Sequence, residues 1–195
     1  MPFLKTLMRL ASSRKNRLCL CLLLGCLLAG ASKVSAQTVS SKEIQIKAVF
    51  LFNFAEFVEW PTNAFVDPHA PLVIGVLGED PFGSFLDDTV RGETVNGHPL
   101  AVRRYQDVSE IKDCHILFIS RSEADRLEQI VAALKDRNIL TVGDFDGFAQ
   151  RGGIIRFVTD KKIHLRINLE MAKAANLTIS SKLLRPSEIV QAGKD

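Results

Sequence analysis

The chain has 195 residues, of which 25 are Lys or Arg and 22 are Asp or Glu. The first 36 residues hold six of the basic side chains and none of the acidic ones, so the rest carries 19 basic against 22 acidic side chains. A weakly acidic chain without a clustered basic face gives no reason to expect nucleic acid or an anionic membrane surface as a partner. The remaining length suits one domain with an ordinary hydrophobic core.

Residues 1–36 have the pattern of a secretory signal peptide. A basic start is followed by an apolar run from Leu18 to Gly30, which is too short to span a bilayer comfortably. The sequence Val34-Ser35-Ala36 fits the small-residue pattern of a cleavage site. We therefore expect export, cleavage after Ala36 and a mature domain over residues 37–195.

Removal of that segment also changes the cysteine count. Cys19, Cys21 and Cys26 lie within it, which leaves Cys114 as the only cysteine of the mature domain. An internal disulfide needs two cysteines, so we expect none.

The stretch from Lys47 to Pro61 holds four Phe and the only Trp of the chain, and we expect a helix here. Residues 40–43, Ser-Ser-Lys-Glu, predict a capping box at its start. Pro61 predicts its end, because the residue before a proline is pushed out of the helical region. One arc of the helix is apolar, and we expect these residues to be buried: Ile46, Phe50, Leu51, Phe54, Phe57 and Val58.

Phe52 falls on the opposite, polar arc of this helix, beside Asn53 and Glu56, and Val49 falls there too. Two interpretations remain open. In one, the helix is covered on both sides and Phe52 belongs to the core. In the other, Phe52, Asn53 and Glu56 form an exposed surface that docks another protein.

Downstream, apolar runs of strand length alternate with helical segments. The runs at 72–77 and 115–119 are almost wholly apolar, which is typical of strands covered on both faces of a parallel sheet. Short loops between such elements predict right-handed crossovers. We expect further strands at 100–104 and 139–142, helical segments at 81–90 and 108–112, and a helix capped by Ser122 that turns Leu127, Ile130, Val131 and Leu134 inward and Glu123 outward.

The end of the chain departs from this alternation. Residues 154–158 and 163–167 flank a polar turn and read as a β-hairpin, followed by helical segments at 169–175 and 180–184. The predicted fold is a single-domain α/β protein with a largely parallel sheet flanked by helices and a C-terminal β-hairpin.

The residue patterns do not predict an enzyme. Residues 75–83 follow a strand and open a helix, but they lack the GxGxxG spacing and the lysine of a phosphate-binding loop. Cys114 and His115 would point to opposite faces of a strand, so they cannot share a proton. The four histidines have no metal-ligand spacing. We expect no catalytic residue, no cofactor and no metal, and a domain that works by binding.

Six blocks of the mature chain, in order, resemble the YfiR family of periplasmic regulators. The resemblance covers nearly all of the mature chain and implies a non-enzymatic α/β domain in the periplasm. The blocks are Lys47-Ala48-Val49-Phe50 through Phe54, Phe57 and Trp60-Pro61; Gly78-Glu79-Asp80-Pro81-Phe82-Gly83; Cys114-His115-Ile116-Leu117-Phe118-Ile119-Ser120; Leu140-Thr141-Val142-Gly143-Asp144; Phe148 with Gly152-Gly153-Ile154-Ile155-Arg156-Phe157; and Ile167-Asn168-Leu169 with Ser180-Ser181-Lys182-Leu183-Leu184.

The resemblance also implies a function and partners. A protein of this family would repress an inner-membrane diguanylate cyclase by binding the periplasmic sensor region of the cyclase. An outer-membrane lipoprotein with a peptidoglycan-binding domain would sequester the repressor, so that cyclic di-GMP rises and cells move toward biofilm. The apolar opening helix is also compatible with a homodimer.

For partner binding we expect two groups of residues. Arg166 can make forked hydrogen bonds to a carboxylate. Asn168 has two open interpretations, a partner contact or a cap of the helix that follows it. The predicted binding residues are Phe52 and Glu56 of the opening helix, with Arg156, Arg166, Asn168 and Glu170 of the hairpin and the turn after it.

A function of another class stays open, that of one lobe of a periplasmic solute-binding protein. Such a lobe would bind a small ligand at the carboxyl ends of its parallel strands. The mature length leaves room for a single lobe only.

The resemblance departs from the family at one position. Members under redox control carry further cysteines that pair with the one in the block of Cys114, whereas this chain has Ile74-Gly75-Val76 in the first strand region. We therefore expect that a reductant leaves thermal unfolding unchanged.

Overall fold

The computed structural model describes residues 34–193. Residues 34–42 belong to a first unit, and a second unit begins at Glu43 and carries the sheet. The predicted signal peptide, residues 1–36, lies outside the described residues except for its last three, which are helical.

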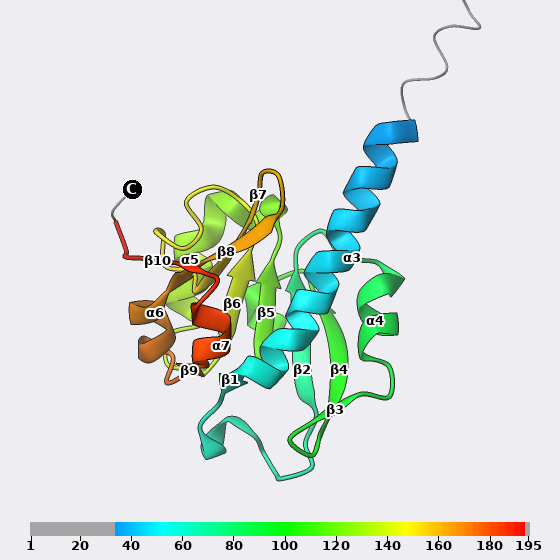
Figure 1. Ribbon diagram of the computed structural model, residues 1–195. Helices are drawn as coiled ribbons and strands as arrows, with labels where there is room; N and C mark the ends of the chain where they lie inside the picture. The colour runs from blue at the N-terminus through cyan, green and yellow to red at the C-terminus, as the bar shows by residue number, and fades with distance from the viewer. Residues whose placement is uncertain (1–33, 194–195) are drawn as a thin grey trace, which may run out of the picture. The chain divides into compact units, whose positions relative to one another are not determined.

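The second unit is built on an eight-stranded sheet in the order β10-β8-β7-β6-β5-β2-β4-β3 (Figure 1). All neighbouring pairs are parallel except β7–β8 and β3–β4. This confirms the predicted α/β fold with a largely parallel sheet and a C-terminal β-hairpin. The strands are β2 (Leu72–Leu77), β3 (Thr94–Val95), β4 (His98–Tyr105), β5 (Ile116–Ile119), β6 (Leu140–Gly143), β7 (Ile155–Thr159), β8 (Ile163–Asn168) and β10 (Glu188–Val190).

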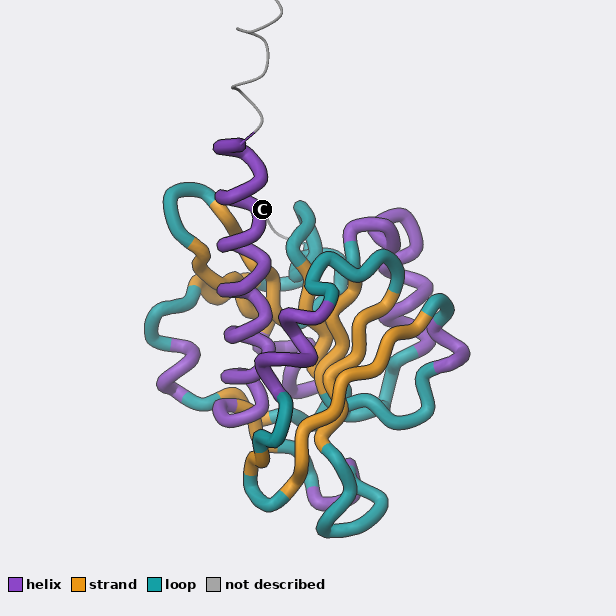
Figure 2. The backbone as a smooth tube through the Cα atoms, turned by 90° about the vertical axis from the view of Figure 1, so that its right-hand side faces the viewer, coloured by secondary structure: helices purple, strands orange, loops and turns teal. Residues whose placement is uncertain are grey.

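Helices cover both faces of this sheet (Figure 2). Buried side chains of α3, α4 and α7 join the core on one face, and those of α5 join the core on the other. The helices are α3 (Val34–Phe57), α4 (Ser84–Val90), α5 (Leu127–Ala133), α6 (Leu169–Ala174) and α7 (Ser181–Leu184); the 3₁₀ turns are η1 (Thr62–Ala64), η2 (Val108–Glu110) and η3 (Arg121–Arg126); and β1 (Val58–Glu59) pairs with β9 (Thr178–Ile179) in a separate two-stranded sheet.

The central strands β2 and β5 are buried at every position. Successive side chains of a strand point to opposite faces. Ile74 and Val76 therefore join the core under α3, while Leu77 and Leu117 join the core under α5. Two covered faces explain why these strands are apolar without alternation, as predicted.

The opening helix differs from the prediction at both ends. α3 begins at Val34, so Ser40 lies within the helix and not at its start. The helix ends at Phe57, before Pro61, because residues 58–59 pair with β9 instead of continuing the helix.

Three further side chains lie elsewhere than predicted. Ile46 was expected inward and is 39% exposed. Glu123 was expected outward and is buried, and its carboxylate accepts hydrogen bonds from the Arg126 guanidinium. Ser122 was expected as a helix cap, but its hydroxyl oxygen accepts the backbone N–H of Glu79 at 3.0 Å, across from β5 to β2.

Candidate functional site

Lys47 fixes α3 to the carboxyl edge of the sheet. Its buried ammonium lies 2.6 Å from a carboxylate oxygen of Glu43 and 2.7 Å from one of Asp144, which follows β6. The Thr159 hydroxyl at the end of β7 donates a hydrogen bond of 2.9 Å to Glu43. A buried charge needs such partners because desolvation of an unpaired ion is strongly unfavourable. These contacts therefore hold this part of α3 in one position on β6 and β7.

The electrostatics of this cluster favour an ionised Glu43. Burial acts to raise the pKa of Glu43, but hydrogen bonds from Lys47 and Thr159 and the charge of Lys47 outweigh it, so the pKa lies below its ordinary value. Glu43 is therefore an anion at neutral pH, as its ion pair with Lys47 requires.

Three phenylalanines pack the inner face of α3 on β7. The rings of Phe54 and Phe157 stack with their centroids 5.8 Å apart, and the Phe50 ring lies 6.1 Å from Phe54 and 5.8 Å from Phe157. Such pairs add about 0.5–1.5 kcal/mol each to the contribution of buried area. The inner arc of α3 is thus a rigid part of the core.

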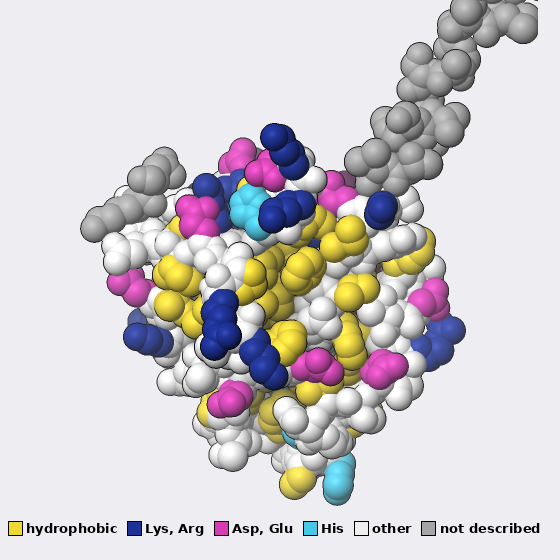
Figure 3. All heavy atoms as spheres, in the orientation of Figure 1, with side chains coloured by type: hydrophobic (Ala, Val, Ile, Leu, Met, Phe, Trp, Pro, Cys, Tyr) yellow, Lys and Arg dark blue, Asp and Glu magenta, His cyan; other side chains and the backbone are white. Residues whose placement is uncertain are grey.

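The outer face of α3 exposes apolar side chains. Val49 is 47% exposed and Ile46 is 39% exposed, three residues apart on one helix face. Phe52 is half-buried and packs on the core, whereas Glu56 is exposed. Hydrophobic side chains gather in a band on the face of the molecule that carries α3 (Figure 3). We call Ile46, Val49, Phe52 and Glu56 the α3 face.

Val49 and Ile46 were not among the predicted binding residues. The sequence carried a signal for Val49, because this apolar residue falls on the polar arc of the helix. It carried none for Ile46, which the same helical periodicity assigned to the buried arc.

The predicted residues Arg156 and Arg166 lie directly opposite each other on β7 and β8. Two like charges in this position repel unless each is neutralised. Arg156 is buried and bonds to Asp146, while Nε of Arg166 donates to Glu188 of β10 at 2.8 Å. Both arginines therefore form ion pairs with acidic side chains of this chain.

Of the two interpretations of Asn168, the structure shows the helix cap. Its side-chain oxygen accepts the backbone N–H of Met171 at 3.1 Å, and its amide nitrogen donates to the carbonyl of Ala149 at 2.8 Å. The side chain is fully buried, whereas Glu170 in the first turn of α6 is exposed.

The structure divides the predicted binding residues between the two faces of the sheet. Phe157 turns toward α3, so its neighbour Arg156 and the opposing Arg166 turn to the other face. Phe52 and Glu56 lie on α3 itself. These residues do not form one continuous site, and their role in partner binding stays a prediction.

The crevice at the carboxyl ends of β2 and β5 is filled by the chain itself. A Cβ atom built on Gly78, which follows β2, would lie 2.4 Å from the Ser122 hydroxyl and 2.8 Å from Glu123. The open-sheet position at which a solute-binding lobe would hold its ligand is thus closed at this point.

At the amino end of the sheet, Phe65 is stacked between two histidines. Its ring centroid lies 3.8 Å from that of His98 and 4.3 Å from that of His115. His115 Nδ1 accepts the backbone N–H of Val73 at 3.1 Å, and its Nε2 lies 3.2 Å from the carbonyl of Ala64. A neutral ring with its proton on Nε2 satisfies both bonds. The stack fixes the loop between β1 and β2 to the start of β5.

Cys114 and His115 do not form a dyad. The Cys114 thiol lies 3.2 Å from the carbonyl of Ile116, while both ring nitrogens of His115 have the partners given above. Burial raises the pKa of Cys114 to about 12. This thiol therefore stays protonated and is a poor nucleophile at neutral pH.

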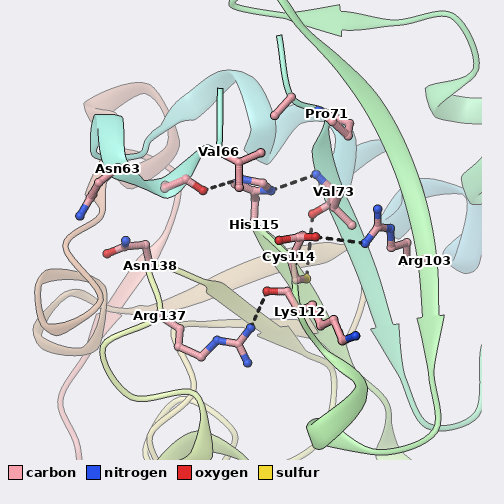
Figure 4. A pocket seen from close by; sticks show the side chains of 13 residues that line it. Asn63, Val66, Pro71, Val73, Arg103, Lys112, Cys114, His115, Arg137 and Asn138 are labelled. Carbon is pink, nitrogen blue, oxygen red and sulfur yellow. Dashed lines mark hydrogen bonds and ion pairs between the residues drawn. The ribbon is translucent and has the colours of Figure 1, made fainter. Parts of the chain in front are cut away.

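Three cavities lie away from the carboxyl edge. One of about 230 Å³ has Cys114 and His115 in its wall (Figure 4), and a mostly apolar one of about 650 Å³ lies beside Trp60 and Phe65. A third, of about 240 Å³, lies between α5 and α6. Within residues 34–193, no group of three or more His, Cys, Asp or Glu side chains is arranged to hold a metal ion. No helix in this part of the chain combines the length and the apolar character needed to cross a membrane.

Comparisons with known proteins identify a family. A family model described as YfiR/HmsC-like matches residues 44–188. A search of curated proteins found no match. A solved structure described as the ABC domain in complex with L-Trp from Streptococcus pneumonia aligns with a TM-score of 0.47 and 11% identity, over 61% of this chain and 55% of that chain. This chain thus spans about half the length of that structure.

Proposed function

This chain belongs to the YfiR/HmsC-like family, and on that premise we propose that it represses an inner-membrane diguanylate cyclase by binding the cyclase's periplasmic sensor region. The family implies a periplasmic regulator of cyclic di-GMP signalling. Repression through direct binding is the more specific step of the proposal. An outer-membrane lipoprotein with a peptidoglycan-binding domain is the proposed competitor for the same repressor.

The observation that supports docking is the α3 face. Val49 and Ile46 expose apolar side chains there, on a helix whose inner side is locked by the aromatic cluster and by Lys47. Full burial of an aliphatic side chain contributes about 1.5–3 kcal/mol to binding. A helix that is already rigid loses little conformational entropy when a partner binds. Glu56 adds a charge at the rim, where it favours a cationic side chain on the partner.

Two partners that compete for one repressor would act as a population shift. The free repressor available to the cyclase depends on the concentration and affinity of the lipoprotein. No conformational change in the repressor is required, which agrees with the fixed position of the second unit's part of α3.

The test places a photo-crosslinking amino acid at Val49 in cells of the source organism. Gln129, exposed on α5, is the matched control position on the other face of the sheet. We expect an adduct with a membrane-bound diguanylate cyclase from position 49 and none from position 129. The variant Val49→Asp should raise cellular cyclic di-GMP, to the same level as we expect from deletion of the gene, while Gln129→Asp should leave it unchanged.

Other outcomes of this experiment would overturn the proposal. Adducts that contain only a second copy of this chain would make the α3 face a homodimer interface. A cyclase adduct from Gln129 and not from Val49 would move the docking site to the other face. Equal cyclic di-GMP in the Val49→Asp strain and the wild type would remove α3 from the mechanism.

A further inference from the structure

The cavity beside His115 is assembled from four separate segments at the amino end of the sheet. The loop before β2 supplies one wall with Asn63 and Val66, and β4 supplies Arg103. The turn before β5 supplies Lys112, and the connection from α5 to β6 supplies Arg137. Figure 4 shows Arg137 and Arg103 on opposite sides of the cavity, with His115 and Cys114 between them. None of the four residues of the α3 face lines this cavity.

The charges around this cavity are unbalanced. Arg103, Lys112 and Arg137 line it, and Asp113 is the single carboxylate among its lining residues. Asp113 lies 3.7 Å from Arg103, which is a loose and exposed pair. Lys112 and Arg137 have no acidic partner within the described chain. The cavity therefore carries an excess of positive charge that a bound anion would neutralise.

Arg137 is held in place before any ligand arrives. One of its terminal nitrogens donates to the carbonyls of Ile111 and Lys112, both at 2.8 Å. The rest of its planar guanidinium, with its other N–H donors, has no hydrogen-bond partner among the described residues. Each of these remaining donors can give one charge-assisted hydrogen bond to a carboxylate or phosphate, and the fixed position of the guanidinium lowers the entropy lost on binding.

The remaining walls do not repel an anion. Cys114 is a protonated thiol, and the His115 ring is neutral with both nitrogens engaged. Apolar side chains line the cavity at the β1–β2 loop and the start of β2, among them Pro71, Val73 and the exposed Val66. A ligand with a charged head and a short apolar body would match both parts.

From this arrangement we propose that the cavity binds a small organic anion, with its carboxylate or phosphate head on Arg137 and Lys112 and its apolar body against the β1–β2 loop. At about 230 Å³ the cavity is smaller than typical drug-sized sites, so the ligand has few heavy atoms. This inference goes beyond the docking function and does not depend on it.

The experiment measures binding of butyrate, its neutral analogue butanamide and inorganic phosphate to the purified mature chain at constant ionic strength. Isothermal titration gives affinity, and amide NMR shifts of Val73 and His115 report the location. The variants are Lys112→Met and Arg137→Met, with Lys135→Met as a matched control. Lys135 is an exposed cation near the same segment that does not line this cavity. Circular dichroism checks that Arg137→Met remains folded, since it also removes two bonds to the backbone.

We expect butyrate to bind saturably and to shift the amides of Val73 and His115, and butanamide to do neither. Lys112→Met should weaken binding by about tenfold through loss of one charged contact, and Lys135→Met should have no effect. Binding of phosphate in place of butyrate would support the site and assign it a phosphate head. Equal binding of butyrate and butanamide, unchanged affinity in Lys112→Met, or no saturable binding of either anion would overturn the proposal.

Discussion

Lys47 of α3 and Asp144 after β6 are 97 residues apart in the chain, and their side chains form an ion pair of 2.7 Å. Lys47 is 6% exposed, so this contact is made largely out of water. The pair joins the first helix of the second unit to the carboxyl edge of the sheet. It thereby sets the position of the α3 face.

Replacement of Lys47 by Met should strongly destabilise the protein. The variant leaves the partly buried Glu43 and Asp144 without their cation, and breaking a buried pair in this way costs about 3 kcal/mol. Urea unfolding followed by circular dichroism gives the change in the free energy of unfolding. Lys42→Met, an exposed lysine on the same helix, should change that free energy by less than about 0.5 kcal/mol. Equal effects of the two variants would show that the ion pair contributes nothing.

Replacement of Asn168 by Ala should separate its structural role from partner binding. The variant removes the cap on Met171 and leaves the Ala149 carbonyl without its donor, which together cost about 2–3 kcal/mol. Asn168→Ser keeps a capping oxygen and should lose about half as much. Thermal unfolding of both variants provides the measurement, and an unchanged midpoint in Asn168→Ala would contradict the capping role.

The strands of the parallel core were predictable because burial leaves a direct trace in the sequence. β2 and β5 are covered on both faces, and this requires an apolar side chain at nearly every position. The hairpin of β7 and β8 was predictable for a different reason. Apolar and polar side chains alternate along its second strand, because one face of this strand is buried and the other is open.

The short pairings were not predictable from local sequence. β10 has three residues with no apolar period, and its place beside β8 depends on the register that brings Glu188 to Arg166. β1 and β9 have two residues each, which is too short for a strand signal, although this pair ends α3.

The two candidate sites also differ in whether the sequence indicated them. Helical periodicity marked Val49 and Phe52 as apolar residues on a polar arc, so the α3 face had a signal. No local sequence pattern indicated the cavity beside His115. Its cations come from residues 103, 112 and 137, which are far apart in the chain and are brought together only by the crossovers of the sheet. Burial of Lys47 was equally hidden, since its partner lies far along the chain.

His115 should make stability depend on pH below about 6.5. Burial lowers the pKa of His115 in the folded protein, and the proton would displace the Val73 N–H from Nδ1. The unfolded chain binds a proton near pH 6.5 and the folded chain only at lower pH, so the stabilisation is complete above 6.5 and is lost as the pH falls from there through the folded pKa. One such group contributes at most about 1.4 kcal/mol per pH unit.

Urea unfolding at several pH values between 7.5 and 5 checks this dependence, at roughly half-unit steps around the unperturbed histidine pKa. His115→Gln should flatten the curve below pH 6.5 as well as lower stability overall, whereas His69→Gln, in an exposed loop, should keep the wild-type slope. A slope in His115→Gln equal to that of the wild type would assign the pH dependence to other groups.

Gly75 and Cys114 offer a position for an engineered disulfide. A Cβ atom built on Gly75 of β2 would lie 2.8 Å from the Cys114 sulfur and equally close to the Tyr105 ring. Gly75→Cys should therefore be overpacked when reduced, with a lower melting temperature than the wild type. On oxidation the two thiols should pair and close a loop of about 40 residues, which raises stability by about 3–4 kcal/mol over the reduced variant.

Thiol titration under denaturing conditions and thermal unfolding with and without reductant measure both effects. The wild type, with Cys114 as the only free cysteine of its described residues, should melt at the same temperature in either condition. Gly75→Ala introduces the overpacking without a thiol and should be destabilised and insensitive to reductant. A Gly75→Cys protein that keeps two free thiols after oxidation would show that Tyr105 blocks the geometry, because the new side chain can reach the sulfur only if this ring gives way.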